Sequence, residues 1–256
     1  AAILLASVAG AARADVVALT DATVHTVSGP TLEHATVVIR DGRIAAVGSD
    51  AVVPAGATVV PCGGKHIYPG MIAANTTLGL VEINSVTGTN DTREIGAINP
   101  NVRAEVEINP ESDKIPVTRV NGITSALVIP QGGVITGTSA LIHLEGWTYE
   151  DMTVKAPVAL HIQWPAMSIV HAWYITESDE VQKQNREKNL KQIRDAFDDA
   201  RAYMKAHDAE GTNGVPRHDR DVKWDGMVKA LRGEIPVVIG CTALNQMDAA
   251  LRFCDQ

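Results

Sequence analysis

Residues 37–48 read VVIRDGRIAAVG, and residues 64–72 read GKHIYPGMI. In the first stretch, Asp41 and Gly42 separate two apolar runs, which predicts a tight β-hairpin because glycine tolerates a positive φ angle in the turn. The neighbouring sequence is rich in β-branched residues and predicts further short strands at residues 16–19, 23–27 and 58–60. The economical interpretation of this part of the chain is a small antiparallel β module.

The sequence pattern changes after this module. Apolar runs predict strands at residues 66–72, 122–130, 140–144, 157–162 and 235–239. Apolar residues at spacings of three and four predict helices at residues 178–208, 224–231 and 244–251. The later part of the chain therefore alternates helices with strands, which is typical of βα units in a parallel sheet or barrel.

The composition is that of a globular protein. The chain has 256 residues, of which 45% are hydrophobic and 20% are charged, and this is enough to bury a sizeable core. The formal net charge of −8 argues against a nucleic-acid surface, because such a surface requires clustered Lys and Arg. No later run approaches the roughly 18 apolar residues of a membrane-spanning helix, so we expect no membrane span.

The first residues resemble a targeting segment. Residues 1–14 read AAILLASVAGAARA, which is similar to the apolar part of a secretory signal peptide with a small-x-small end. An ordinary Ala-rich helix is the alternative interpretation. We expect an exported protein, periplasmic or extracellular. The chain starts at Ala1 and ends at Gln256 directly after a helical pattern, so we also expect it to be a fragment.

No local motif of the sequence specifies a chemistry. The three cysteines form no CxxC pair, and no two of the eight histidines lie within four residues of each other. No single element therefore presents a pair of histidines to a metal ion. His161, inside an apolar strand, is the histidine least explained by an ordinary structural role. The residues alone predict a β module followed by α/β structure.

The expected function of the chain rests on its resemblance to a protein family. Residues 22–72 run in the order strand, Asp-Gly-Arg-Ile, strand and Gly-Lys-x-x-x-Pro-Gly-Met-Ile. This order resembles the N-terminal part of the amidohydrolase superfamily, and it is most like exported members of the imidazolonepropionase-like type. The resemblance covers residues 18–256 and is sharpest over residues 18–80.

The resemblance implies a composite α/β fold. Residues 1–14 would be a partial signal peptide, residues 15–65 the N-terminal part of a composite β-sandwich, and residues 66–256 the first part of a distorted, incomplete (β/α)8 TIM-like barrel. The active site would lie at the carboxyl ends of the barrel strands. Family members bind one or two divalent metals, often zinc, which activate water for attack on a C–N bond.

The sequence departs from the family at the expected metal site. The first barrel strand of the family ends in Asp-x-His-x-His, but those three positions are Ala73, Asn75 and Thr77 here. A later strand that would end in a ligand histidine has Gly240 instead. Amide and hydroxyl oxygens are weak zinc ligands compared with imidazole. We therefore expect no metal ligand here and take Asn75 and Thr77 as substrate-binding candidates, with plain hydrogen bonding at a strand end as the alternative.

Two functions stay open at this point. The first is a metal-assisted hydrolase that acts on a C–N bond, other than an ordinary peptide bond, in a small amide, cyclic amide or dipeptide-like substrate. A divalent metal such as zinc is then expected from the family, and this chain alone would be inactive. The alternative is a non-catalytic relative that keeps the barrel for binding a small molecule.

The acidic residues are concentrated in one stretch. Residues 82–113 carry seven acidic and two basic side chains. A polar connection of this length is often functional, and the resemblance places it after the first barrel strand, on the active-site face. We expect its carboxylates, among them Glu105, Glu107 and Glu111, to shape the mouth of the pocket and to disfavour anionic substrates.

Overall fold

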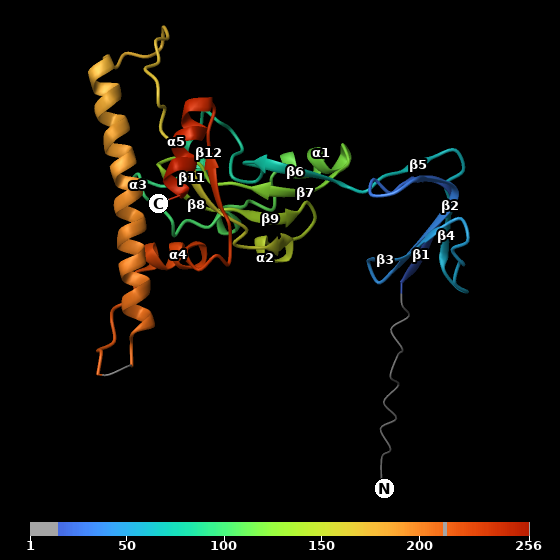
Figure 1. Cartoon of the computed structure of the whole chain (residues 1–256). Coiled ribbons are helices and arrows are strands. Elements are labelled where there is room, and N and C mark those ends of the chain that lie inside the picture. The colour runs from blue at the N-terminus through green and yellow to red at the C-terminus, as the bar shows by residue number, and fades with distance from the viewer. Residues whose placement is uncertain (1–14, 212–213, 256) are drawn as a thin grey trace. The chain divides into compact units, whose positions relative to one another are not determined.

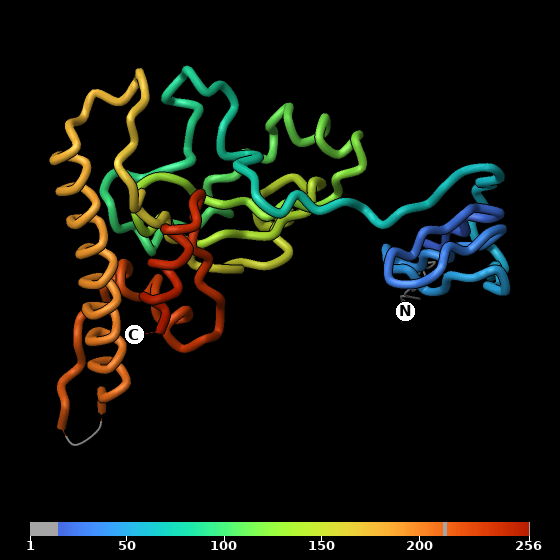
Figure 2. The backbone as a smooth tube through the Cα atoms, turned by 45° about the horizontal axis from the view of Figure 1, so that its top comes forward, coloured from blue at the N-terminus to red at the C-terminus, as the bar shows by residue number. Residues whose placement is uncertain are grey.

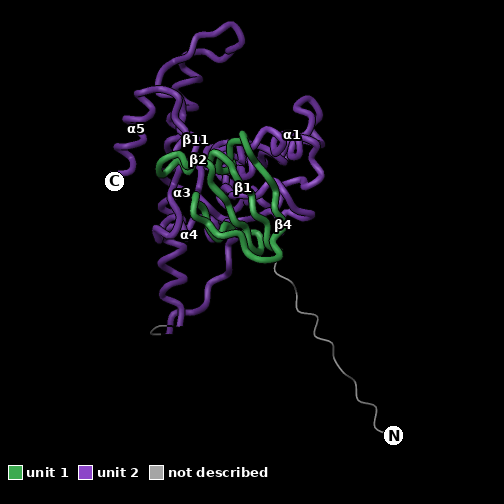
Figure 3. Tube along the Cα trace, turned by 90° about the vertical axis from the view of Figure 1, so that its right-hand side faces the viewer, with its two compact units in different colours: residues 1–70 green, residues 71–256 purple. Residues whose placement is uncertain are grey.

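The computed structural model describes residues 15–211 and 214–255, so the expected signal segment at residues 1–14 lies outside the described residues. The chain divides into two compact units that meet between Gly70 and Met71 (Figure 3). Within the described residues, no helix is long and apolar enough to cross a membrane. Each unit is described by itself below.

The first unit is a five-stranded sheet. Its strands are β1 (Val16–His25), β2 (Thr31–Arg40), β3 (Arg43–Gly48), β4 (Thr58–Pro61) and β5 (His66–Ile67) (Figure 1). The order is β3-β2-β1-β4, and β5 also pairs with β1. The predicted hairpin is confirmed: β2 pairs antiparallel with β3, and Asp41 and Gly42 adopt φ angles of 50° and 72° in the turn. The antiparallel arrangement is incomplete, because β4 and β5 both pair with β1 in parallel.

One face of this sheet carries a small apolar core. Its buried members alternate along the strands, as a period of two requires, and are Ala22, Val24, Ala35, Val37 and Cys62. Leu32, Ile39 and Ile67 pack against them. The residues that alternate with this set face away from the core, and His25 and His66 are among them.

The second unit contains two sheets. The four-stranded sheet has the order β10-β9-β7-β6, and the three-stranded sheet has the order β12-β11-β8. Their strands are β6 (Met71–Thr76), β7 (Ile123–Val128), β8 (Ile135–Thr138), β9 (Ala140–His143), β10 (Thr153–Lys155), β11 (Leu160–Gln163) and β12 (Val237–Gly240). Two neighbouring pairs are parallel, β6 with β7 and β11 with β12.

The predicted helices are confirmed, and two short ones were not predicted. The helices α3 (Asp179–Asp208), α4 (Val222–Leu231) and α5 (Leu244–Cys254) lie close to the expected positions. The short helices are α1 (Lys114–Val120) and α2 (Tyr149–Met152). The mixed α/β architecture agrees with the sequence, although the described residues close no barrel.

Helices cover one face of the three-stranded sheet. Leu160 and Ile162 of β11 share a buried apolar cluster with Ile193 and Phe197 of α3 and Ala250 of α5. Figures 1 and 2 show α3, α4 and α5 gathered beside β11 and β12. Since side chains alternate along a strand, His161 and Gln163 lie on the sheet face opposite these helices.

The acidic connection is ordered rather than a free loop. Two 3-10 turns, Thr87–Thr89 and Ala104–Glu107, lie in it, and residues near Ile98 and Arg103 bridge to β8 in parallel. Glu105 was expected at a pocket mouth, and this is wrong: its side chain is only 3% exposed and is paired with Arg103 at 2.6 Å. A carboxylate buried in this way serves the packing of the connection, whereas Glu107 and Glu111 are exposed.

Gly137 of β8 permits the close approach of this connection. A Cβ atom at residue 137 would lie 2.6 Å from the backbone oxygen of Val102, and the φ angle of Gly137 is +119°. The Gly137→Ala variant should therefore lose at least about 2 kcal/mol of unfolding free energy, because the backbone strain and the overlap add. Chemical denaturation followed by circular dichroism measures this loss.

The matched control for this prediction is Gly88→Ala, because a Cβ atom at Gly88 meets nothing within 4 Å. The control should stay within about 0.5 kcal/mol of the natural chain. Equal stabilities of the two variants would contradict the role given to Gly137.

Candidate functional site

The carboxyl ends of β11 and β12 form one polar edge of the three-stranded sheet. The two strands are parallel and in register from Leu160 with Val237 to Gln163 with Gly240. Parallel strands end at the same edge of a sheet, and ligands of open α/β sheets bind outside this edge. This edge is therefore the first candidate for a ligand-binding site.

The side chain of Gln163 lies over Gly240. A Cβ atom at Gly240 would be 2.6 Å from Oε1 of Gln163 and 3.2 Å from its Nε2. The carboxamide therefore occupies the space that a side chain at residue 240 would enter. Gln163 is exposed, so its amide offers both a donor and an acceptor to a ligand at this edge. Gln163 was not a predicted site residue, because it follows the predicted strand of residues 157–162 directly but no motif marks it.

Asn75 and Thr77 lie at the carboxyl end of β6, in the four-stranded sheet. Asn75 is exposed and Thr77 is half-buried. The backbone oxygen of Thr77 accepts a hydrogen bond from the N–H of Leu80 at 2.9 Å, and the hydroxyl of the intervening Thr76 accepts one from Leu78 at 3.1 Å. Among the described residues, no partner hydrogen-bonds to the side chain of Asn75 or Thr77. Both side chains are thus free to bind a ligand.

The two pairs of strand-end residues belong to different sheets. Asn75 and Thr77 follow β6, whereas Gln163 and Gly240 end β11 and β12. The structure brings Gln163 and Gly240 together by strand register, and it records no hydrogen bond between this pair and Asn75 or Thr77 within residues 15–211 and 214–255.

A metal ion does not fit these positions. Asn75 offers an amide, Thr77 offers a hydroxyl and Gly240 offers no side chain. Across the described part of the chain, no group of three or more His, Cys, Asp or Glu side chains is placed to hold a metal ion. Partial burial raises the pKa of the nearby Cys241 thiol.

Gln246 ties together the segments that follow β11 and β12. Its Oε1 accepts hydrogen bonds from the backbone N–H groups of Thr242 and Ala243, at 2.9 and 3.0 Å. Its Nε2 donates to the backbone oxygens of Trp164 and Pro165, at 2.9 and 3.2 Å. This buried amide therefore holds both connections at the carboxyl edge, a role that no sequence motif predicts.

His161 is a neutral group beneath this edge. Its side chain is 4% exposed, and its Nε2 has no hydrogen-bond partner. Burial lowers the pKa of His161 to about 4. The imidazole is thus uncharged at neutral pH, and it occupies a position two residues before the end of β11.

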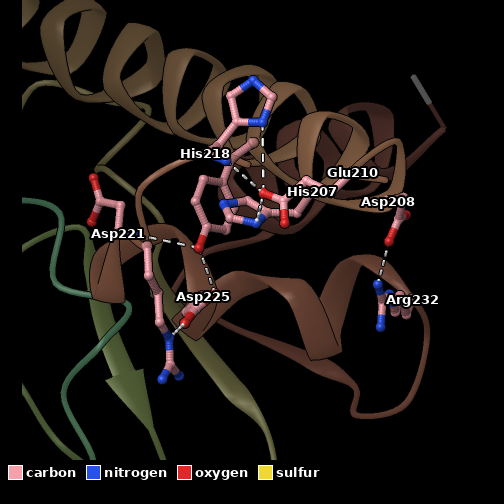
Figure 4. A network of polar contacts seen from close by, with 9 residues as sticks. His207, Asp208, Glu210, His218, Asp221, Asp225 and Arg232 are labelled. Carbon is pink, nitrogen blue, oxygen red and sulfur yellow. Dashed lines mark hydrogen bonds and ion pairs between the residues drawn. The ribbon is translucent and has the colours of Figure 1, made fainter. Parts of the chain in front are cut away.

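A second polar network lies between the end of α3 and α4 (Figure 4). Glu210 Oε1 is 2.8 Å from Nδ1 of His207 and accepts the backbone N–H of His218 at 2.9 Å. That N–H, followed by the charges of His207, His218 and Arg217, holds the pKa of Glu210 below its ordinary value. Tyr203 donates to Asp225 at 2.7 Å, and these groups line a cavity of about 370 Å³.

This network is a structural junction rather than part of the strand-end site. Arg220 pairs with Asp225, and Arg232 pairs with Asp208 at 2.6 Å. Most of its charged groups therefore have a partner of opposite sign within the network. Since α4 leads into the amino-terminal end of β12, the network stands apart from the carboxyl edge.

Removing the Gln246 amide should loosen the two edge segments. We expect Gln246→Ala to lower the free energy of unfolding by about 2–4 kcal/mol, because several buried backbone groups lose their partner. Gln246→Glu should lose at least as much, since its buried carboxylate cannot donate to Trp164 and Pro165 and places a charge against their backbone oxygens. Denaturation midpoints measure both.

The control is the neighbouring exposed amide, Asn245→Ala, which loses one surface hydrogen bond to Ser168. It should change stability by no more than about 1 kcal/mol. A Gln246→Ala variant as stable as this control would show that the edge is held by other contacts.

The burial of His161 should make stability depend on pH. As pH falls below about 6.5, the unfolded chain takes up a proton at this residue, whereas the folded chain stays neutral down to about 4. The contribution of His161 to stability is therefore present above pH 6.5 and declines between pH 6.5 and 4. His161→Phe should remove this decline, and its loss of stability between pH 7 and pH 4.5 should be smaller than that of the natural chain.

Denaturation curves at both pH values measure this difference, with the exposed His143 as control in a His143→Asn variant. Parallel pH profiles for His161→Phe and the natural chain would contradict the prediction.

The chain is similar to known proteins in sequence and in fold. No family model matches the chain. Among curated proteins, the chain is similar to Amidohydrolase tasK of Hapsidospora irregularis, with 22% identity over 225 residues, which is 77% of this chain and 22% of that protein. Among solved structures, it is similar to an amidohydrolase from Thermotoga maritima MSB8, with a TM-score of 0.81 and 22% identity over 93% of this chain and 61% of that one.

The chain thus spans about a fifth of the curated relative and about three fifths of the solved one. At 22% identity, the structural likeness establishes a common fold and leaves the chemistry to the site residues. The described residues share the mixed α/β fold of the matching part of the Thermotoga maritima amidohydrolase.

Proposed function

We propose that this chain supplies the first part of the catalytic fold of an amidohydrolase-type enzyme. The whole protein would hydrolyse a C–N bond in a small amide, cyclic amide or dipeptide-like substrate. The observation that supports this most is the fold shared with the Thermotoga maritima amidohydrolase over 93% of the chain. In this proposal, β6, β7, β11 and β12 are barrel strands, and their carboxyl ends face the substrate.

The strand-end residues would bind the substrate rather than a metal ion. Asn75 has a free amide, and Gln163 presents a second amide at the edge of the other sheet. Amide groups donate and accept hydrogen bonds without a charge, so they suit the polar and uncharged C–N groups of an amide substrate. Any divalent metal that the whole protein uses must be held by residues other than Asn75, Thr77 and Gly240.

A second function has a specific observation in its favour. The strand ends lack the imidazoles that family members use for the metal, which fits a relative that binds a small amide without hydrolysing it. The two proposals share the binding role of Asn75 and Thr77 and differ only in turnover.

The experiment uses the whole protein and measures metal content together with hydrolysis of a panel of N-acyl amino acids, dipeptides and cyclic amides. The hydrolase predicts turnover of at least one compound. In that case, Asn75→Ala should raise KM about tenfold with a smaller change in kcat, because one hydrogen bond to the substrate is lost. The thermal midpoint of this variant should not move, since the side chain has no partner within the described residues.

The control is Asn245→Ala, which removes an exposed amide of α5 and changes no residue of β6. Tight binding of a panel compound without turnover would support the non-catalytic relative and refute the hydrolase. Neither binding nor turnover, across the whole panel, would refute both proposals.

A further inference from the structure

Three polar side chains gather on the first unit's sheet, on the face opposite its core. Val24 and Ile67 pack in the core, so their neighbours His25, His66 and Tyr68 point to the other face. The imidazoles come from two adjacent parallel strands, because β1 pairs with β5 through Thr23 with His66 and Val24 with Ile67. All residues of the group belong to the first unit.

The two imidazoles approach each other edge to edge. His25 Nε2 is 2.9 Å from His66 Nδ1, and the rings are 5.2 Å apart between centroids with an interplanar angle of 24°. Tyr68 stacks on His25 with a centroid distance of 4.2 Å and an interplanar angle of 1°. The Tyr68 ring therefore holds the plane of the His25 imidazole.

The remaining nitrogen of His25 also has a partner. Thr31, the first residue of β2, pairs with His25 in the sheet and places its hydroxyl 3.3 Å from His25 Nδ1. In metal sites, the non-ligating nitrogen of a histidine is commonly held by such a hydrogen bond, which orients the ring. The arrangement of Thr31, His25 and His66 across three neighbouring strands has this form.

We propose that His25 Nε2 and His66 Nδ1 together bind a late first-row divalent cation, with Cu²⁺ the tightest. Two nitrogen ligands in adjacent positions of a tetragonal ion, each about 2.0 Å from the metal, are about 2.8 Å apart. The observed separation of 2.9 Å matches this value. In the free site the two nitrogens face each other across a hydrogen bond, so both rings must turn until their lone pairs converge on one ion.

The choice of ion follows from the number of ligands. No third His, Cys, Asp or Glu of the described residues joins the pair, so water completes the coordination. Structural zinc sites use four protein ligands, whereas Cu²⁺ has the highest affinity of the series for nitrogen ligands and accepts a tetragonal geometry with water. A two-histidine site on a solvent face thus favours Cu²⁺, followed by Ni²⁺.

The protons balance when the ion binds. In the free site, one ring donates its N–H to the lone pair of the other. When the ion binds, a His25 that carries its proton on Nε2 carries it on Nδ1 instead, and this N–H donates a hydrogen bond to the Thr31 hydroxyl. His66 keeps its proton on Nε2, which faces away from the pair. The ion therefore binds to the two imidazoles with no net release of protons.

The test is a titration of the chain with CuCl₂, followed by calorimetry against a competing chelator of known affinity. We expect one site in the natural chain and at least tenfold weaker binding in His25→Asn and in His66→Asn. The matched control is His171→Asn, which removes an exposed histidine of the second unit and should leave the affinity within twofold.

Electron paramagnetic resonance of the natural chain gives a readout that needs no variant, since hyperfine structure from two coordinated nitrogens is expected. Thr31→Val should weaken binding severalfold without removing either nitrogen, which distinguishes a positioning residue from a ligand. The proposal is overturned if the natural chain binds no Cu²⁺ at a single site, or if a His25→Asn, His66→Asn double variant that retains its circular dichroism spectrum binds it equally well.

Discussion

The parallel pairing of β11 with β12 is the constraint on which the candidate site depends. It joins segments far apart in the chain, and its register sets Gln163 beside Gly240. A parallel pair requires a crossover connection, which here contains α3 and α4, and these helices must bury one face of the sheet. Leu160 and Ile162 on that face are fully buried against α3 and α5, so the polar residues His161 and Gln163 are left for the other face.

The pairing also determines which backbone groups need hydrogen-bond partners beyond the ends of the strands. At the carboxyl ends of β11 and β12, the following segments need partners for their backbone groups, and the buried amide of Gln246 supplies several of them. The amides of Gln163 and Asn75 are exposed instead. Burial, and not residue type, thus separates the amide that holds the structure from the amides that face solvent.

The sequence predicted those parts of the fold that depend on local patterns. The hairpin at Asp41 and Gly42 follows from turn chemistry, and α3 follows from its apolar spacing. The helices α1 and α2 were not predicted, because they have only seven and four residues, too few to show a helical period. No local sequence pattern predicts the burial of Glu105, since this burial results from the parallel contact of its segment with β8.

The candidate site could be predicted from the sequence only in part, through the family resemblance, which pointed to Asn75, Thr77 and Gly240. Gln163 and Gln246 carry no motif, and their roles arise from strand register and long-range hydrogen bonds that no local spacing encodes.

The two environments of histidine in this fold lead to different chemistry. His161 is enclosed in the second unit, where burial lowers its pKa to about 4 and leaves its Nε2 without a hydrogen-bond partner. His25 and His66 lie on the solvent side of a sheet, held by the ring of Tyr68 and the hydroxyl of Thr31, and their nitrogens already face each other. Imidazole chemistry requires a lone pair that a ligand can reach. By this criterion, His25 and His66 present reachable nitrogens to an ion, whereas the ends of β6 and β11 present the neutral amides of Asn75 and Gln163.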